Sequence, residues 1–179
     1  MTELLQTTSQ TVGPFFAYSL TPKQYGYDFT NILDGNLVSE DRAGEHIQIV
    51  GRVLDGNGDA IPDALIELWQ SDIQAIGRFG TGTDAKNRFI FNTIKPQSVE
   101  GQAPHLNVII LMRGLLVHTY TRIYFSDEQE ANAKDAILQS IPEERRATLI
   151  AERTERSGQT VYVFNILMQG EGETVFFDV

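Results

Sequence analysis

His105 and Asn107 are the first candidates for chemistry in this sequence. They precede the apolar run 108–112, and residues i and i+2 of a strand point to the same face. Two histidines at this spacing would form half of a metal site, but an amide is a poor ligand for a hard cation such as Fe³⁺. The pattern leaves two readings open: residual metal chemistry, or a hydrogen-bonded His–Asn pair near a strand end.

Tyrosine and cysteine are informative by their absence. The chain has six tyrosines, yet none lies between Trp69 and His105. A metal site that needs a phenolate ligand from this stretch is therefore excluded. The chain has no cysteine, which removes disulfides, thiolate nucleophiles and thiolate metal sites, and which fits a reducing compartment.

Arg122 and the Gly13-Pro14 turn are candidates for contact with a ligand. Arg122 lies in the alternating segment 118–125, where its guanidinium can pair with a ligand carboxylate or with one of the 24 acidic residues of the chain. The sequence leaves both partners open. In the segment that begins at Thr11, Gly13 and Pro14 favour a turn through which the backbone can approach a ligand or another chain closely.

Composition limits the classes of partner. The chain has 179 residues, of which 41% are apolar and 21% charged, as expected for one globular domain. Its net charge of −10 is opposite in sign to that of nucleic-acid binders and repels anions at long range, so an anionic substrate needs a local cation. We expect no nucleic-acid partner. No apolar run approaches the ~20 residues of a membrane span, and residues 1–10 lack a signal-peptide pattern. We therefore expect a cytoplasmic protein without a membrane partner.

These candidates must be positioned by strands. Turn-forming residues and weak periodicity predict an irregular arm over residues 1–45, which packs on its own domain or on a partner. Short strands, regular turns and the absence of βαβ alternation predict a mostly β protein, an antiparallel β-sandwich over residues 46–179. We expect its strands at 47–54, 64–70, 88–92, 105–112, 117–125, 161–168 and 174–177.

Two short helices are expected near residues 127–151. Ser126 and Gln129 have the spacing of a capping box, and apolar residues recur every fourth position from Ala133 to Ile141. A second helix should begin after Pro142, because acidic residues come early and Arg153 late in the segment, as the helix dipole favours. Both helices should pack on one end of the sandwich.

Seven further stretches, together with residues 9–14, give the sequence a family resemblance. They follow one another in order from residue 9 to the C-terminus, and the last is especially specific. The seven stretches are 51–58, 66–70, 92–96, 103–105, 121–125, 131–134 and 169–178. In this set of segments the chain resembles the intradiol ring-cleavage dioxygenases, and within them the subunits that lack the iron.

The resemblance implies where iron ligands would stand. Iron-bearing members of the family hold one ferric ion with two tyrosines and two histidines. Of these, one histidine falls on His105 and the second on Asn107. One tyrosine would follow the Lys95-Pro96 turn, where this chain has 97–99 without tyrosine, and the other would lie in 71–79, which also lacks one. The resemblance therefore implies that this chain binds no metal by itself.

The resemblance also implies a partner and a reaction. The Fe(III) cofactor would lie in a homologous iron-bearing β subunit within a higher-order αβ assembly, and the small aromatic substrate would be protocatechuate, opened by O2 between its two hydroxyls. Thr11, Gly13, Pro14 and Arg122 would form part of the substrate-pocket wall at the subunit interface. The alternative is a transthyretin-like or carboxypeptidase-regulatory-like β-sandwich, a binding or structural module without catalysis, which the segment 51–69 alone would suit equally well.

Overall fold

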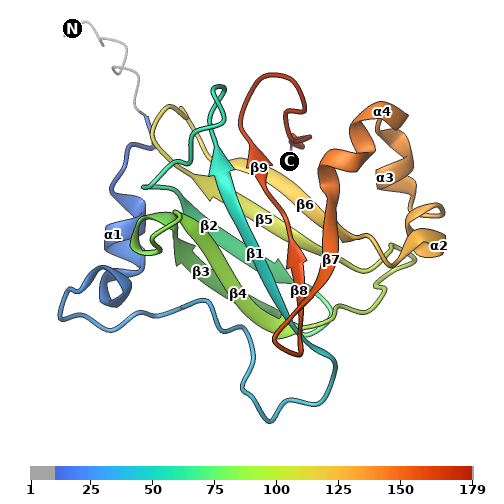
Figure 1. Cartoon of the computed structure of the whole chain (residues 1–179), viewed down its shortest axis with the longest axis horizontal. Helices are drawn as coiled ribbons and strands as arrows, with labels where there is room; N and C mark the ends of the chain where they lie inside the picture. Colours follow the sequence, from blue (N-terminus) through green and yellow to red (C-terminus); the bar gives the residue numbers. More distant parts are fainter. Residues whose placement is uncertain (1–10, 179) are drawn as a thin grey trace, which may run out of the picture.

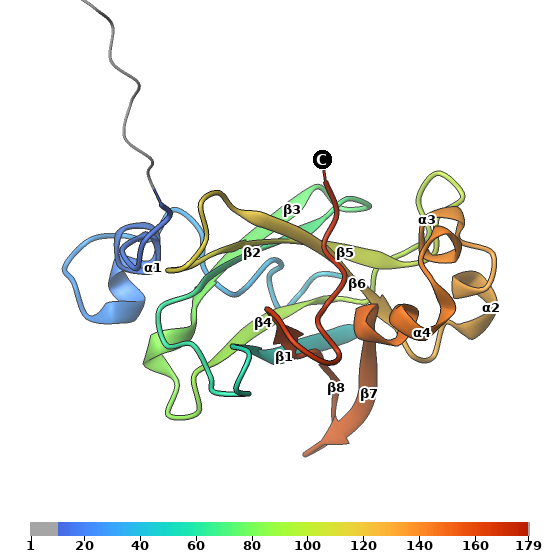
Figure 2. The ribbon, with the colours of Figure 1, turned by 90° about the horizontal axis from the view of Figure 1, so that it is seen from above.

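The protein forms two packed layers of strands. The structure is a computed structural model that describes residues 11–178, so Ser9, Gln10 and the rest of the first ten residues lie outside it. One layer has the strand order β3 (Ala75–Gly80), β2 (Leu65–Gln70), β5 (His105–Leu111) and β6 (Thr119–Phe125). The other has β7 (Ile150–Arg156), β8 (Gln159–Val163), β1 (His46–Leu54) and β4 (Arg88–Ile94), with the short β9 (Ile166–Leu167) on β1. Figure 2 shows the two layers from above.

The expected β-sandwich is confirmed, although its sheet is mixed. Five strand pairs are antiparallel, but β1 pairs in parallel with β8 and β9, and β6 pairs in parallel with β7. The β6–β7 pairing joins the two layers through two residue pairs. The two layers therefore belong to one sheet, which bends between β6 and β7 so that its halves pack face to face.

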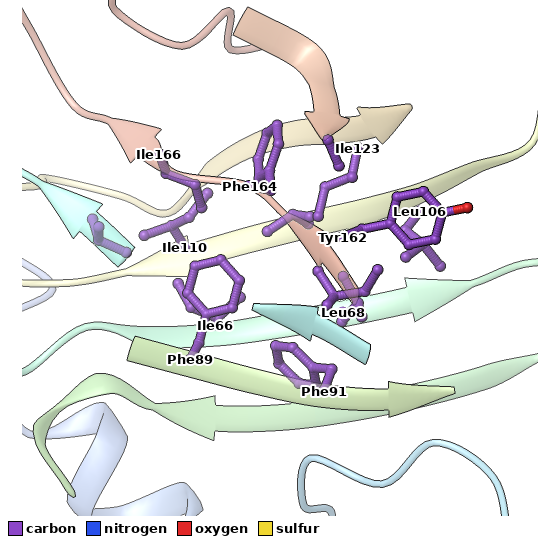
Figure 3. Close-up of a cluster of buried hydrophobic side chains, with 14 of the residues drawn as sticks. Ile66, Leu68, Phe89, Phe91, Leu106, Ile110, Ile123, Tyr162, Phe164 and Ile166 are labelled. Atoms are coloured by element: carbon purple, nitrogen blue, oxygen red, sulfur yellow. The ribbon is translucent and has the colours of Figure 1, made fainter. Parts of the chain in front are cut away.

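The core lies between the two layers because alternate residues of each strand face inward. On β5, Leu106, Val108 and Ile110 are buried while the residues between them are partly exposed. Figure 3 shows the cluster, in which each layer contributes large apolar side chains. Between the layers Phe125 on β6 meets Tyr162 on β8 edge to face, with ring centroids 4.8 Å apart. Alternation thus leaves the outer faces free for polar side chains.

The helical region departs from the expectation. It consists of α2 (Gln129–Asn132), α3 (Ala136–Ser140), α4 (Glu143–Arg146) and the 3₁₀ turn η3 (Ala147–Leu149). The predicted cap is wrong, because the Ser126 hydroxyl accepts from the Arg153 backbone N–H instead. The predicted helical position of Arg153 is also wrong: residues 150–156 form β7, which pairs with β8 over five residues. Tertiary pairing here outweighs a weak helical charge pattern.

Three strands differ from the expectation elsewhere, and one of them, expected at 161–168, divides into β8 and β9. β3 was not expected, because it has Gly77 and Gly80 in a segment whose residues are typical of a loop; it pairs with β2 over six residues. The expected strand at 174–177 makes one isolated bridge, between Phe177 and Tyr120. Pairing with a neighbouring edge, rather than local preference, decides β3 and the segment 174–177.

The arm lies on the sandwich. It contains α1 (Phe16–Leu20) and the 3₁₀ turn η1 (Pro22–Tyr25), and it precedes β1, which starts at His46. Gln24 makes two hydrogen bonds with the backbone of Gly80 on β3, and Leu37 donates to the carbonyl of Asn92 on β4. In both ribbon views α1 and the α2–α4 group lie at opposite ends of the molecule (Figures 1 and 2). No helix in residues 11–178 is long and apolar enough to cross a membrane.

Candidate functional site

His105, Asn107 and Arg122 share the outer face of the first layer. Asn107 on β5 lies opposite Trp69 on β2 and opposite Arg122 on β6, so these three residues form one row across three strands. In the adjacent row His105 lies opposite Tyr124. The i, i+2 spacing of His105 and Asn107 thus places both on one face, as the sequence predicted.

His105 and Asn107 do not form the hydrogen-bonded pair that was one reading of the sequence. The His105 ring donates from Nδ1 to the carbonyl oxygen of Ala103 at 2.8 Å, which leaves Nε2 as an acceptor. Asn107 accepts from the hydroxyl of Tyr120 and donates to Ser71 Oγ at 3.4 Å. Burial lowers the pKa of His105, so the ring is neutral near pH 7.

Arg122 carries its charge without an acidic partner among the described residues. Its Nη1 donates to Gln102 Oε1 at 2.7 Å and to the Tyr124 hydroxyl at 3.4 Å, and it takes part in none of the ion pairs of residues 11–178. Burial by itself lowers the pKa of Arg122, but the hydroxyls of Tyr124 and Tyr120 raise it overall. The internal salt bridge that the sequence left open is therefore not formed with any described residue.

Asp135 supports this face and was missed by the sequence analysis. Its carboxylate accepts from the backbone N–H of Ala103 and of Leu138, both at 2.8 Å, and from the Tyr124 hydroxyl at 3.2 Å. Burial raises the pKa of Tyr124 to about 12, so this phenol stays protonated and donates. An aspartate directly before a short apolar helix is an N-cap signal that could have identified it.

The two segments in which iron-bearing relatives would have tyrosine ligands, 71–79 and 97–99, are joined here by a hydrogen bond. Residues 71–74 make the turn between β2 and β3, and the Asp72 carboxylate accepts from the Gln97 N–H at 3.0 Å. A hollow of about 620 Å³ lies beside them, lined also by Lys95 and Pro104. Within residues 11–178 no group of three or more His, Asp or Glu side chains is placed to hold a metal ion. The donors around His105 therefore do not fit ferric iron.

The arm turn lies elsewhere. The Val12 N–H donates to the carbonyl of Leu115, in the loop that joins β5 to β6, at 2.9 Å. Gly13 has a φ of +70°, a left-handed conformation that favours glycine, while Thr11 is exposed and Pro14 partly exposed. No hydrogen bond or ion pair among the described residues links this turn to Arg122, whose partners lie toward the α2–α4 end. The structure brings Arg122, His105 and Asn107 together but leaves Thr11, Gly13 and Pro14 apart from them.

Comparison with known proteins finds relatives that are chains of one kind of enzyme. No family model matches the chain. The chain is 46% identical over the full length of both chains to the protocatechuate 3,4-dioxygenase alpha chain of Burkholderia cepacia. It is 40% identical to that of Pseudomonas putida, over 98% of each chain. The beta chain of the Burkholderia cepacia enzyme is 29% identical, over 84% of this chain and 77% of that one.

Solved structures show the same fold. The dioxygenase domain of a dioxygenase–carbohydrate-binding protein fusion from Streptomyces sp. SirexAA-E superposes with a TM-score of 0.63 and 20% identity, over 80% of this chain and 89% of that one. Hydroxyquinol 1,2-dioxygenase from Pseudomonas putida DLL-E4 gives 0.59 and 17%, over 90% and 65%. These likenesses confirm the intradiol dioxygenase fold, and the full-length identities show that the chain belongs to the protocatechuate 3,4-dioxygenase alpha chains.

Proposed function

We propose that this chain is the α subunit of a protocatechuate 3,4-dioxygenase and binds no iron itself. With an iron-bearing β subunit it would cleave the ring of protocatechuate between the two hydroxyls, using O2, to give 3-carboxy-cis,cis-muconate. Two alpha chains at 46% and 40% identity support the assignment, and a beta chain at 29% identity supports a homologous partner.

One observation supports the proposal that the partner, and not this chain, binds the iron: too few suitable ligands surround His105. Ferric iron is a hard cation that prefers phenolate, carboxylate and imidazole ligands. The neighbours of His105 are instead the amide side chain of Asn107 and the turn 71–74, which contains no tyrosine. A single neutral imidazole is not enough to hold the ion, so the iron would belong to the partner.

The arm turn would form part of the substrate-pocket wall on the partner. Thr11 presents an exposed side chain whose hydroxyl can donate or accept, and Pro14 fixes the direction of the chain. Gly13 has no neighbour within 4 Å of the position where a Cβ would stand, so its role is conformational: its left-handed φ shapes the turn. Such a turn closes a pocket and excludes water while leaving the iron chemistry to the other chain.

Arg122 is the candidate contact for a substrate carboxylate. The protein as a whole repels anions, and a local guanidinium with unused N–H groups offsets this repulsion. Because Arg122 lies in a different part of the chain from the arm turn, the two assignments are tested separately. Arg122→Ala should raise the KM for protocatechuate about tenfold or more, and Arg122→Lys should recover part of the loss. Unchanged steady-state constants would remove Arg122 from the pocket.

The proposed function is tested by purifying the chain alone and with a co-expressed β chain. We expect co-purification, about one iron atom per αβ pair, and ring cleavage only in the pair. Stoichiometric iron with activity in the isolated chain would overturn the division of labour. A chain that never associates with the β chain would favour the alternative of a β-sandwich module without catalysis.

A further inference from the structure

A hollow on the outer face of the second layer is strongly basic. It has a volume of about 210 Å³ and lies over β1, β4 and β8, on the face away from the core. The residues that line it are Val50, Gly51, Arg52, Lys86, Arg88, Arg156, Val163 and Asn165. Four of the chain's 14 lysines and arginines are thus gathered here, in a protein of net charge −10. This cluster of positive charge is opposite in sign to the net charge of the protein.

Strand register forces two of these cations together. Arg52 on β1 and Arg88 on β4 are directly opposite one another in the antiparallel pair. Like charges placed directly opposite on one sheet face destabilise the pair. Arg88 is compensated, because Asp84 accepts from its Nε at 2.9 Å and from its Nη2 at 2.7 Å. Arg52 has no such compensation among residues 11–178.

Three cations around the hollow have no partner within residues 11–178. The side chains of Arg52, Lys86 and Arg156 take part in no ion pair or hydrogen bond between described residues. The Asn165 side chain accepts from the Arg52 backbone N–H at 3.1 Å through Oδ1, which leaves its amide N–H groups free to donate. The rim therefore presents donors and positive charge without an acceptor to match them.

The base of the hollow is formed by residues of two paired strands. Val50 and Val163 face each other in the parallel β1–β8 pair and give it an apolar base. The volume matches a compact anion rather than an extended chain.

We propose that this hollow binds a small anion with two or more negative charges, either a phosphate or a di- or tricarboxylate. The shared chemistry is a set of oxygen acceptors that bridge Arg52, Lys86 and Arg156. Binding would also relieve the repulsion between Arg52 and Arg88. This inference does not depend on the proposed catalytic function.

The test is isothermal titration calorimetry at low ionic strength, on the full chain. Inorganic phosphate, citrate and acetate are the probes. We expect phosphate or citrate to bind at least tenfold more tightly than acetate, and the tighter of the two identifies the source. Arg52→Gln and Arg156→Gln should each weaken binding about tenfold or more, because each removes a charge-assisted hydrogen bond. Arg42→Gln, which removes an exposed arginine from the arm, is the matched control.

Thermal unfolding gives a second readout. In anion-free buffer Arg52→Gln should have a higher Tm than the unsubstituted protein, because the like-charge pair is gone, yet phosphate or citrate should raise its Tm less. Failure of both phosphate and citrate to bind at millimolar concentration would overturn the proposal. Equal affinity in Arg52→Gln, Arg156→Gln and the unsubstituted protein would overturn it as well.

Discussion

Asp135 shows how one buried carboxylate can organise several segments of the chain. It is 1% exposed and receives hydrogen bonds from a loop backbone, a helix backbone and a strand phenol. A buried charged acceptor is costly unless such donors surround it, and each donor is costly if the acceptor is removed. The positions of His105 and Arg122 therefore depend on a residue that contacts neither directly.

Removing the Asp135 carboxylate should strongly lower the stability of the protein. We expect Asp135→Ala to lower the free energy of unfolding by about 3–5 kcal/mol, because two backbone N–H groups and the Tyr124 hydroxyl lose their partner in the interior. Asp135→Asn keeps one acceptor oxygen and should lose less. Urea denaturation of both variants checks this, with the exposed Asp28→Ala as control. A loss below 1 kcal/mol for Asp135→Ala would show that the carboxylate is not the organising group.

The partly buried ring of His105 should make stability depend on pH. Burial lowers its pKa in the folded state below the ordinary value of 6.5, with nearby Arg122 acting in the same direction and Asp135 and Asp72 opposing it. Between the two pKa values the unfolded chain binds more protons than the folded one, so stability is lost as the pH falls below about 6.5. His105→Gln should lose less stability than the unsubstituted protein between pH 7.5 and 5.5.

Urea denaturation at the two pH values measures the difference, and the titration of the His105 ring by NMR measures its cause. His118→Gln, in the exposed loop after β5, is the matched control. A His105 titration midpoint above 6.5 would contradict the expected direction.

At the scale of elements, Lys95 links the end of β4 to the turn after β6 by ion pairs and to β8 by a hydrogen bond. Its ammonium is 7% exposed and lies 3.0 Å from Asp127 Oδ2, 3.2 Å from Glu128 Oε1 and 3.0 Å from the Tyr162 hydroxyl. It also stands over the Phe125 ring. Burial alone lowers the pKa of Lys95, but the hydrogen bonds with these acceptors raise it overall. The ammonium stays charged and joins the two layers.

Lys95→Met should lower the free energy of unfolding by about 1–3 kcal/mol. Breaking a fully buried pair costs about 3–5 kcal/mol, but about a third of each carboxylate partner is exposed, so solvent screens part of the loss. Lys134→Met, which removes an exposed lysine, should change stability by less than about 0.5 kcal/mol. Equal denaturation midpoints for the two variants would show that this ion pair does not hold the layers together.

The elements also show which parts of the fold are local. The alternation of buried residues along β5 and the placement of His105 and Asn107 on one face follow from strand geometry alone. β7 and β3 could not be predicted this way, because each is fixed by pairing with another strand, across the turns at 157–158 and 71–74, rather than by its own residue pattern. The same holds for Asp135, whose donors come from three segments, and for the separation of Arg122 from the arm turn.

At the scale of the whole molecule, exposed apolar surface gathers at the arm end. Trp69 is exposed on the outer sheet face, but every other large exposed apolar residue of 11–178 lies in the arm or in the β5–β6 loop that the arm contacts. These residues are Phe15, Phe16, Tyr18, Tyr27, Phe29, Ile32, Leu116 and Val117. A patch of this kind marks an interface. It is continuous with the Thr11–Pro14 turn, so we expect the β subunit of the proposed assembly to cover this end.

The double substitution Phe29→Ser with Ile32→Ser should therefore disrupt assembly without disrupting the fold. These side chains are 70% and 88% exposed, so the isolated chain loses little packing, whereas a partner that buries them loses about 1.5–3 kcal/mol for each. Retention of an untagged β chain on the tagged variant should fall more than a hundredfold in affinity, with the Tm of the chain nearly unchanged. Trp69→Ser, which removes the one large exposed apolar group of residues 11–178 outside this patch, should retain the β chain. The reverse result, with Trp69→Ser losing the β chain and the arm variant keeping it, would place the partner on the outer face that carries Arg122 and His105.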